Sequence, residues 1–496
     1  MPDPLNANTS VPQAFDVLVI GGGPAGVTAA LRASELGASV ALVERARLGG
    51  TCTLDGCVPT RVLAHAARLL RDVEQCEDYG FFGPRPALDF PQLIAKTQKV
   101  VYRIEEKKQL IRHLEASGIT VFAGAGQASF VDPNRVALRD GTQLQASRFI
   151  ICAGGRPRRL DFPGAEHAIT HSDVWSLRAL PESIAIIGAA ATGCQLASIF
   201  STFGARVALF DVSPRILPAE DLLLSQEMAS AFTRRWIEIY PGIEGINRIE
   251  KGGDQLQFYY SAEGKTRNIS VETVILAVGW PGNLAGLNLE AAGVESSKGY
   301  IPVDVKLQTN VPHIFAAGDI TGKMMLVQSA SYEARVAAEN AVLGEGQAYA
   351  HKVVPHGGFT DPEYGSVGMT EEEARGRHNC LTATIPYADL DRAVIDGRLE
   401  GFCKLIVSRE THRILGAHVM GEGALEVVQI VAAGMTAGVK VDQFAQIELA
   451  YPTYAAIVGL AARKLSSELG NVPMASEWLA LGRPHAAEWE RRDEES

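Results

Sequence analysis

Two stretches of the chain repeat one order of apolar and polar residues. Residues 19–44 read VIGGGPAGVTAALRASELGASVALVE, and residues 186–211 read IIGAAATGCQLASIFSTFGARVALFD. In each copy a short apolar run precedes a glycine turn, a helical stretch follows, and a second apolar run ends in an acidic residue. Apolar runs of this kind are typical of strands that are covered on both faces. The pattern therefore predicts two related units of strand, turn, helix and strand.

The predicted strands occupy matching positions in the two copies. They are expected at Phe15–Ile20 and Ser39–Val43 in the first copy, and at Ser183–Ile187 and Arg206–Phe210 in the second. The uncharged run at 184–204 contains a glycine turn and several polar residues. Because a membrane span needs about 20 consecutive apolar residues, we expect a buried strand and helix there, and no membrane insertion.

The glycines and acids of the two copies have the spacing of a dinucleotide-binding site. In such a site the first glycine permits a tight turn, the second lets the backbone approach a pyrophosphate, and the third lets helix and strand pack closely. The helix N-terminus then offers free N–H groups to the phosphates, and an acid at the end of the second strand can accept the ribose hydroxyls. The first copy supplies Gly21, Gly23, Pro24, Ala25, Gly26 and Glu44, and the second supplies Gly188, Gly193 and Asp211.

The second copy departs from this pattern at one position. Ala190 stands where the first copy has Gly23, and its methyl group is expected to crowd a pyrophosphate. The alternative interpretation is a structural turn with weakened nucleotide affinity. Asp211 repels the 2′-phosphate of NADP and suits the free 2′-hydroxyl of NAD, although Arg215, four residues further on, could reach a phosphate. NADH is therefore favoured over NADPH.

Composition and charge exclude several classes of protein. The chain has 496 residues, of which 47% are hydrophobic and 21% charged, so we expect a globular protein of about three domains and not a disordered or disulfide-stapled chain. Its net charge of −11 argues against a nucleic-acid partner held by bulk charge. The first fourteen residues have neither Lys or Arg nor an apolar core, so they do not resemble a secretory signal, and a cytoplasmic location is expected.

Two of the seven cysteines are close together in a stretch rich in glycine. Cys52 and Cys57 lie in GGTCTLDGCVPTR, residues 49–61, before an amphipathic helix expected from Val62 to about Glu74. A helix dipole lowers a thiol pKa and favours exchange chemistry. Zinc would need further cysteines or histidines at ligand spacing, and none follows, so no metal site is predicted. The spacing of Cys52 and Cys57 alone does not decide between a redox-active disulfide and two buried thiols.

This stretch and the first glycine turn resemble the pyridine nucleotide–disulfide oxidoreductases, the family of glutathione reductase, dihydrolipoamide dehydrogenase and mercuric reductase. Further motifs occur in the same order as in that family, and the resemblance covers about residues 14–465. They are the turns ICAGGRP (151–157) and AVGWPGN (277–283), the FAD-like motif TNVPHIFAAGD (309–319), and dimerisation-domain segments at 359–370, 401–405 and 414–421.

The resemblance implies an α/β fold with two Rossmann-like dinucleotide-binding domains, one for FAD and one for NAD(P), and a C-terminal α+β dimerisation domain through which a homodimer forms. The implied parts are a flexible N-terminus 1–14, an FAD-binding domain split into 15–165 and 296–350, an NAD(P)-binding domain 166–295, a dimerisation domain 351–465, and a C-terminal extension 466–496 that contains Trp478 and Trp489.

The resemblance also implies a role for individual residues. FAD is expected on the first glycine turn, with Glu44 at its ribose and Asp319 at its ribityl chain. Hydride passes from the nicotinamide to the flavin, and electrons leave through a Cys52–Cys57 disulfide, in which Cys57 faces the flavin and Cys52 attacks the substrate. The remaining cofactor-binding residues that the resemblance implies are Gly50, Thr51, Gly154, Gly279 and Gly318.

The chain departs from the family near its C-terminus. Disulfide-reducing members carry His-Pro-Thr and a glutamate five residues after the histidine, where this chain has Tyr451 and Ala456. A phenol with a pKa of about 10 is a poor proton shuttle at neutral pH, so efficient turnover of glutathione disulfide or lipoamide is not expected. A tyrosine in this part of the chain is similar to mercuric reductase, although this chain lacks that enzyme's C-terminal vicinal cysteines. A packed aromatic residue at the subunit boundary is the alternative interpretation.

Three further departures fall beside the expected flavin. The family's lysine four residues after the second cysteine is Arg61, its glutamate partner is Gln195, and the aromatic residue over the nicotinamide pocket is Ala191. A permanent cation without a carboxylate partner is expected to favour anionic reduced flavin. The alternative is that Arg61 is a plain surface charge.

Three functions remain open from the sequence. The first is an FAD enzyme that takes hydride from NADH or NADPH and reduces a small-molecule acceptor, namely a small disulfide, a metal ion or a quinone-like compound. The second is a flavoprotein with an impaired nicotinamide site that exchanges electrons with a partner protein. The third is a redox sensor or scaffold that keeps the fold and FAD. Retention of Cys52, Cys57 and Asp211 favours the first function.

Overall fold

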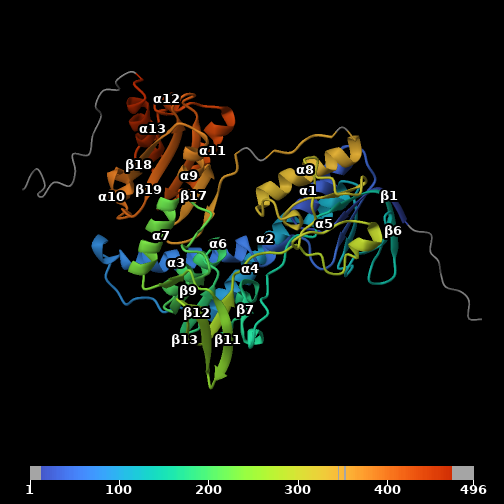
Figure 1. Cartoon of the computed structure of the whole chain (residues 1–496), viewed down its shortest axis with the longest axis horizontal. Helices are drawn as coiled ribbons and strands as arrows, with labels where there is room; N and C mark the ends of the chain where they lie inside the picture. The colour runs from blue at the N-terminus through green and yellow to red at the C-terminus, as the bar shows by residue number, and fades with distance from the viewer. Residues whose placement is uncertain (1–12, 345, 351–352, 472–496) are drawn as a thin grey trace, which may run out of the picture. The chain divides into compact units, whose positions relative to one another are not determined.

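The computed structural model describes residues 13–344, 346–350 and 353–471. By its contacts the chain divides into two compact units, Met1–Pro218 with Phe232–His351 (unit 1) and Ala219–Ala231 with Lys352–Ser496 (unit 2). Figure 1 labels the elements of both units. Most of the expected N-terminal segment 1–14, and the C-terminal extension from residue 472 with both of its tryptophans, lie outside the described residues. Among the helices of the described residues, none combines the length and the apolar character that a membrane span requires.

The first repeat copy lies in a seven-stranded sheet of unit 1. Its strands β1 (Gln13–Ile20) and β2 (Val40–Glu44) pair in parallel, and α1 (Pro24–Glu35) packs against both of them. The last strand of this sheet, β15, pairs with β6. The strands of a second sheet lie between β6 and β15 in the sequence, so the chain leaves the first sheet and later returns to it. The strands are β1 (Gln13–Ile20), β2 (Val40–Glu44), β3 (Thr120–Ala123), β4 (Ser129–Asp132), β5 (Arg135–Ala137), β6 (Gln143–Ile151) and β15 (Ile314–Ala316).

The second half of strand β1, Val17–Ile20, is buried on both faces, as its unbroken apolar run predicts. Val17 and Val19 pack into a core with helices α1 (Pro24–Glu35) and α8 (Val327–Leu343). Leu18 and Ile20 point into a second core on the opposite face of the sheet. Successive side chains of a strand alternate between the two faces, so a strand covered on both faces needs an apolar residue at every position.

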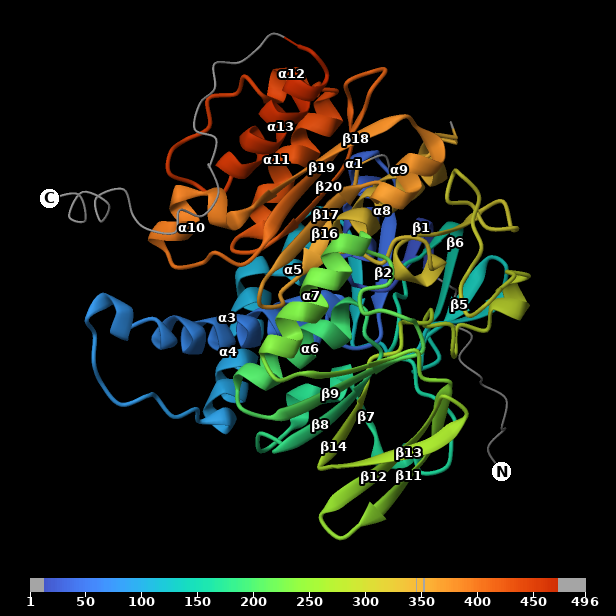
Figure 2. The ribbon, with the colours of Figure 1, turned by 60° about the vertical axis from the view of Figure 1, so that its left-hand side comes forward.

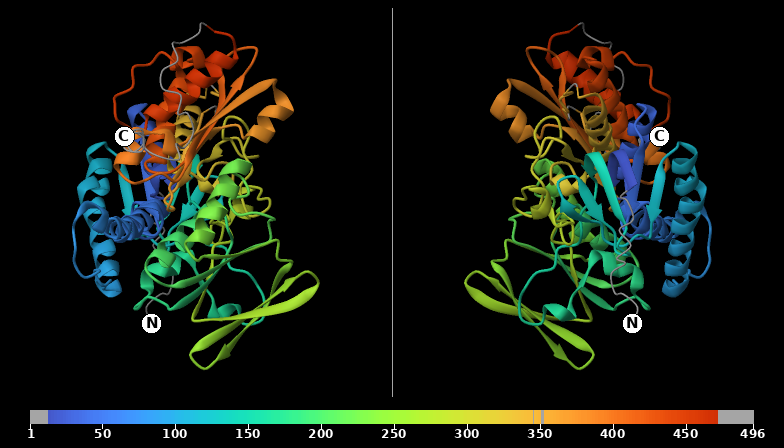
Figure 3. Two further views of the ribbon diagram at one scale, coloured as in Figure 1. Left: turned by 90° about the vertical axis from the view of Figure 1, so that its left-hand side faces the viewer. Right: turned by 90° about the vertical axis from the view of Figure 1, so that its right-hand side faces the viewer.

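The second repeat copy lies in a parallel five-stranded sheet of unit 1, which runs in the order β10-β9-β8-β14-β7. The sheet consists of β7 (Ile169–Thr170), β8 (Ser183–Ile187), β9 (Arg206–Asp211), β10 (Glu238–Pro241) and β14 (Thr273–Leu276), and α6 (Ala191–Thr202) packs against β8 and β9. The antiparallel strands β11 (Gly245–Gly252), β12 (Gln255–Ala262) and β13 (Lys265–Val271) form a separate twisted ribbon (Figure 3). The α/β fold with two related dinucleotide-binding units is therefore confirmed.

The segment between the two sheets is helical. It contains α2 (Gly50–Leu54), α3 (Cys57–Glu74), α4 (Phe90–Lys108) and α5 (Leu110–Ala116). Helices α3 and α4 run side by side (Figure 2), and α3 also packs against α6. The expectation that this helix begins at Val62 is wrong, because α3 already begins at Cys57. Pro59 lies in the first turn, where its missing N–H has no intrahelical partner to lose.

Unit 2 is built on an antiparallel five-stranded sheet. Its order is β16-β17-β20-β19-β18, from β16 (His356–Gly358), β17 (Tyr364–Gly368), β18 (Cys380–Pro386), β19 (Phe402–Ser408) and β20 (Ile414–Met420). The helices of this unit are α9 (Glu371–Arg377), α10 (Asp391–Ile395), α11 (Ala424–Ala437), α12 (Val441–Phe444) and α13 (Ala456–Glu468). Helix α7 (Leu222–Arg234) begins in unit 2 and ends in unit 1.

The two faces of strand β19 have different chemistry. Cys403, Leu405 and Val407 pack into the apolar core beneath α11 and α13. Lys404 points to the other face, where its ammonium group contacts Asp221 Oδ1 at 2.7 Å, and both side chains are at least 95% buried. Glu371 Oε2 lies 2.6 Å from the same ammonium group. A buried charge is tolerated when it is paired in this way.

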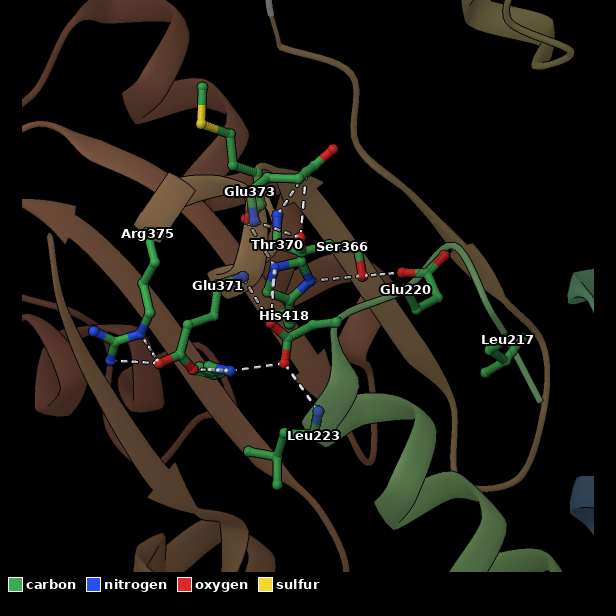
Figure 4. A network of polar contacts seen from close by, with 12 residues as sticks. Leu217, Glu220, Leu223, Ser366, Thr370, Glu371, Glu373, Arg375 and His418 are labelled. Atoms are coloured by element: carbon green, nitrogen blue, oxygen red, sulfur yellow. Dashed lines mark hydrogen bonds and ion pairs between the residues drawn. The ribbon is translucent and has the colours of Figure 1, made fainter. Parts of the chain in front are cut away.

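A second group of polar contacts joins residue 220 to the same sheet (Figure 4). Glu220 accepts a hydrogen bond from the Ser366 hydroxyl at 2.6 Å, and His356 Nε2 lies 3.1 Å from its other carboxylate oxygen. His418 contacts Ser366 through Nδ1 at 3.1 Å. The pairing with His356 helps to lower the pKa of Glu220, and against the opposing effect of burial it raises the pKa of His356. These contacts attach residues 219–222 to the sheet of unit 2.

Candidate active site

The first glycine turn is held by two close backbone approaches. A Cβ atom on Gly21, whose φ is +111°, would lie 2.3 Å from the Cys152 carbonyl oxygen, and one on Gly26 would lie 1.7 Å from that of Gly21. Gly23 is different, because a Cβ there would meet only the Cα of Gly50, at an ordinary 3.6 Å. The chain itself therefore does not require glycine at position 23, whereas a phosphate group that approaches the backbone would. This turn fits a dinucleotide.

Glu44 and Asp211, the acids that end the two repeat copies, make equivalent hydrogen bonds to the backbone. Glu44 accepts the N–H of Gly22 at 2.7 Å and that of Ala46 at 2.9 Å. Asp211 accepts the N–H of Ala189 at 2.5 Å and that of Ser213 at 2.7 Å. Each carboxylate is thus fixed beside its glycine turn at the end of the second strand, which is where a ribose is bound in this type of site.

The second glycine turn has the same shape as the first. A Cβ on Gly188 would lie 2.4 Å from the Ala277 carbonyl oxygen, and one on Gly193 would lie 1.8 Å from that of Gly188. Ala190 has φ −79° and ψ −171°, close to the −75° and −175° of Gly23. Alanine therefore fits this backbone without strain. Because neither N-cap residue has a polar side chain, the first N–H groups of α1 and α6 remain directed at the turns, as an anion site requires.

Cys52 and Cys57 lie in adjacent helices at the edge of the first glycine turn. Gly50 begins the helix that contains Cys52, and it packs so closely that a Cβ on it would lie 2.7 Å from the Cα of Gly23. Cys57 is the first residue of the 18-residue helix α3. The structure describes both cysteines as free thiols. Each of the two thiols shifts the pKa of the other.

The two thiols are electrostatically distinct. The hydrogen bond with Cys52 lowers the pKa of Cys57 to about 7. The same bond, together with burial, raises the pKa of Cys52. A thiol at a helix N-terminus is further stabilised as the thiolate by the helix dipole. Cys57 therefore ionises more readily than Cys52, and such a difference between two thiols suits exchange chemistry.

The motif at 309–319 lies against the same turn. A Cβ on Gly318 would come within 3.2 Å of the Ala25 side chain, and the Gly318 N–H donates to Glu333 at 2.8 Å. Burial, with a smaller effect of the Glu333 charge, raises the pKa of Asp319 to about 6. The charge of Asp319 in turn raises the pKa of Cys52 and opposes the lowered pKa of Cys57. The structure thus brings the first glycine turn, the cysteine pair and Asp319 together.

The remaining predicted residues of unit 1 lie in turns or helices near these groups. Gly154 accepts the N–H of Asn283 at 2.9 Å, so the turns at 151–157 and 277–283 are joined; Gly279 of the second turn accepts the Arg158 N–H at 3.0 Å. Thr51 lies in α2 beside Cys52, and Arg61 lies in the first part of α3. Gln195 donates to the Ala191 carbonyl at 2.9 Å within α6.

Tyr451 is not among the residues that unit 1 brings together, because it belongs to unit 2. Its side chain is 76% exposed, and its hydroxyl donates to Asp391 Oδ2 at 2.6 Å. This hydrogen bond raises the pKa of Tyr451, which makes the phenol a weaker proton donor still. Ala456 is the first residue of α13.

Sequence reasoning missed three residues, two of them beside the cysteine pair and one beside the Gly318–Asp319 turn. Lys108, at the end of α4, donates to the Thr53 hydroxyl at 3.2 Å. Trp175 donates from its indole nitrogen to the Asp55 carbonyl at 2.9 Å, in the loop between the cysteines. The third is the fully buried Glu333, which accepts the Gly318 N–H. Each reaches the site from a distant part of the chain, and no local motif marks it.

Comparison with known proteins agrees with this geometry. The family model for pyridine nucleotide-disulphide oxidoreductases matches residues 15–334, and the model for the dimerisation domain of that family matches residues 354–462. Dihydrolipoyl dehydrogenase of Bacillus subtilis is 30% identical over 465 residues, covering 90% of this chain and 97% of that protein. Mercuric reductase of Bacillus cereus is 30% identical over 445 residues, covering 89% of this chain and 70% of that protein.

Solved structures show the same similarity. The HOCl-induced flavoprotein disulfide reductase RclA from Escherichia coli superposes with a TM-score of 0.80 and 26% identity, covering 90% of this chain and 99% of that one. Its Cu(II) complex superposes with a TM-score of 0.81, covering 91% of this chain and 100% of that one. The two glycine turns, the cysteine pair and these matches lead to one conclusion: the chain belongs to the class I pyridine nucleotide–disulfide oxidoreductase family.

Proposed function

We propose that this protein is an FAD-dependent oxidoreductase that takes hydride from NADH and passes two electrons through Cys52 and Cys57 to a small-molecule acceptor. The observation that carries this proposal is the contact between the start of α2 and the first glycine turn, where Gly50 packs against Gly23. A dinucleotide on that turn has the cysteine pair as its neighbour. Bound FAD would supply the conversion of a hydride into electrons that a disulfide accepts.

The chain's own residues have separate tasks in this proposal. The turn at 21–26 and the N-terminus of α1 bind the FAD pyrophosphate, Glu44 binds the ribose, and Asp319 binds the ribityl chain. Cys57, whose pKa is lowered to about 7, holds the thiolate next to the flavin. Cys52 is the thiol that attacks the acceptor, which is a small disulfide, a metal ion or a quinone-like compound.

The second glycine turn supports NADH as the donor. Asp211 is fixed at the end of β9, where its negative charge would repel a 2′-phosphate. Arg215, which the sequence left as a possible phosphate ligand, donates to the Pro218 carbonyl at 2.8 Å. The backbone at Ala190 is unstrained, so its methyl group leaves the shape of the turn intact and acts only by crowding a pyrophosphate. We further propose that the dimerisation domain forms a homodimer and that the enzyme is cytoplasmic.

The experiment that tests this proposal follows flavin absorbance while NADH is added to the purified protein without oxygen. The wild type is expected to be yellow, to bleach, and to develop the long-wavelength band of a thiolate beside oxidised flavin. Cys57→Ser is expected to keep its flavin and its reduction by NADH but to lose that band. Cys52→Ser is expected to keep the band and to lose turnover of disulfides. A wild-type protein without flavin, or one that NADH does not bleach, would refute the proposal.

A further inference from the structure

The end of helix α4 places a cation beside the helix that contains Cys52. Gln109 adopts a left-handed conformation with φ 42° and ψ 44°, which ends α4 at Lys108, and α4 packs against α2. The Lys108 amino group donates to the Thr53 hydroxyl at 3.2 Å. Thr53 follows Cys52 directly in α2 and is only 1% exposed. The charge of Lys108 also acts on the neighbouring Cys52 thiol, whose pKa it lowers.

The ammonium group of Lys108 is available to a thiolate. Within the described residues, no carboxylate oxygen lies within ion-pair distance of it. One turn earlier on α4, the Glu105 carboxylate is paired with Arg47 at 3.6 Å. Lys108 is exposed, so solvent screens part of its field, and the part that remains favours the ionised form of a neighbouring thiol.

Three charged or titratable groups act on Cys52 from three different elements. Cys57 of α3 and Asp319 of η5 (Asp319–Thr321) both raise its pKa, whereas Lys108 of α4 lowers it. The thiolate of Cys57 and the carboxylate of Asp319 both oppose a second negative charge. Lys108 is the group in this set that favours the ionised form of Cys52.

We propose that Lys108 is the positioning residue whose positive charge stabilises the Cys52 thiolate when it attacks the acceptor. The inference rests on the proposed function, in which Cys52 is the attacking thiol. Relatives that reduce disulfides use a histidine to take up the thiol proton, and this chain has Tyr451 at that position. With Lys108 beside Cys52, the proton can leave to solvent because the thiolate that remains is stabilised.

The reaction with a disulfide acceptor then balances as follows. The Cys52 thiolate forms a bond to one acceptor sulfur, the acceptor S–S bond breaks, and the other sulfur leaves as a thiolate. The Cys57 thiolate next forms a bond to the Cys52 sulfur and releases the second acceptor thiolate. The dithiol is oxidised by two electrons and the acceptor is reduced by two, and NADH restores the dithiol.

The test titrates Cys52 alone, in a Cys57→Ser background, by the rate at which iodoacetamide alkylates the Cys52 peptide at each pH. Lys108→Met is expected to slow alkylation at pH 7 by about 3- to 10-fold, which corresponds to a rise of about half to one unit in the Cys52 pKa. The two rates should converge at high pH, where the thiol is fully ionised. Lys107→Met, which removes an adjacent exposed charge, is the matched control and should leave the profile unchanged.

Two further variants separate charge from anchoring. Lys108→Arg keeps the charge and should restore most of the rate, and Thr53→Val removes the hydrogen bond but keeps the charge and should shift the profile little. A Lys108→Met profile identical to that of the Cys57→Ser protein, or a Thr53→Val shift as large as that of Lys108→Met, overturns the inference. The titration of Cys52 uses no nicotinamide, so its outcome does not depend on hydride transfer. Failure of NADH to bleach the wild-type flavin would instead refute the proposed function. Flavin content and thermal melting show whether each variant has folded.

Discussion

The repeat offers a paired test of which glycine turn binds which nucleotide. A Cβ on Gly193 would lie 1.8 Å from the Gly188 carbonyl oxygen, and a Cβ on Gly26 would lie 1.7 Å from that of Gly21. In both copies the added methyl meets backbone and cannot be accommodated by a side chain that rotates away. The helix must therefore move by about 1 Å relative to the strand, which displaces its N-terminal N–H groups from the phosphate.

The size of the effect follows from the cost of overpacking. An inserted methyl group of this kind costs about 1–3 kcal/mol, and every 1.4 kcal/mol is a factor of ten in affinity. We expect Gly193→Ala to raise the NADH concentration needed for half-maximal flavin reduction by roughly 5- to 100-fold, with flavin content unchanged. Gly26→Ala is expected to lose flavin instead. Ala190→Gly, which removes a methyl at an unstrained position, should bind NADH as well as the wild type or more tightly.

The assay is anaerobic stopped-flow reduction of the flavin over a range of NADH concentrations, with flavin content measured beforehand from the absorbance spectrum. The reasoning fails if Gly193→Ala is reduced by NADH like the wild type. It also fails if Gly193→Ala loses its flavin while Gly26→Ala keeps it, because the two turns would then have been assigned to the wrong nucleotides.

Two other predictions concern unit 2. Lys404→Met leaves the buried Asp221 carboxylate without its cation and is expected to lower the free energy of unfolding by about 3–5 kcal/mol. Arg375→Met removes the 59% exposed partner of Glu371 and should lower it by less than about 1 kcal/mol. Calorimetric melting of the two variants and the wild type measures the difference. Tyr451→His alone is expected to raise lipoamide turnover by less than the double variant with Ala456→Glu, because an imidazole without an orienting carboxylate is a poor proton shuttle; equal steady-state rates would contradict this.

Local pattern and spacing were enough to predict the elements that hold the nucleotides. The repeat located strands that the structure places within one or two residues of their expected bounds, as for β8 at Ser183–Ile187. The glycine spacing also predicted the two close backbone approaches in each turn. These features depend on residues near one another in sequence, where steric rules act directly.

The features that sequence reasoning missed depend on long-range packing. Lys108 reaches α2 across 55 residues, and Trp175 reaches the loop between the cysteines across 120. Asp221 is joined to β19 across 183 residues. A lysine, a tryptophan or an aspartate at such positions has no local signature, because its role is decided by the element that packs against it. Helix α3 also begins five residues before the expected Val62, with Pro59 in its first turn, a position that accepts proline.

In the proposed reaction, electrons from NADH break a disulfide bond between Cys52 and Cys57. Two samples, one with and one without anaerobic NADH, are alkylated with one isotopic form of iodoacetamide, which labels free thiols. Each sample is then unfolded and reduced, and the thiols released from disulfides are labelled with a second isotopic form. We expect both cysteines to change from the second label to the first when NADH is present, while the buried Cys152 and Cys194 do not change. Identical labelling of Cys52 and Cys57 with and without NADH would contradict the account.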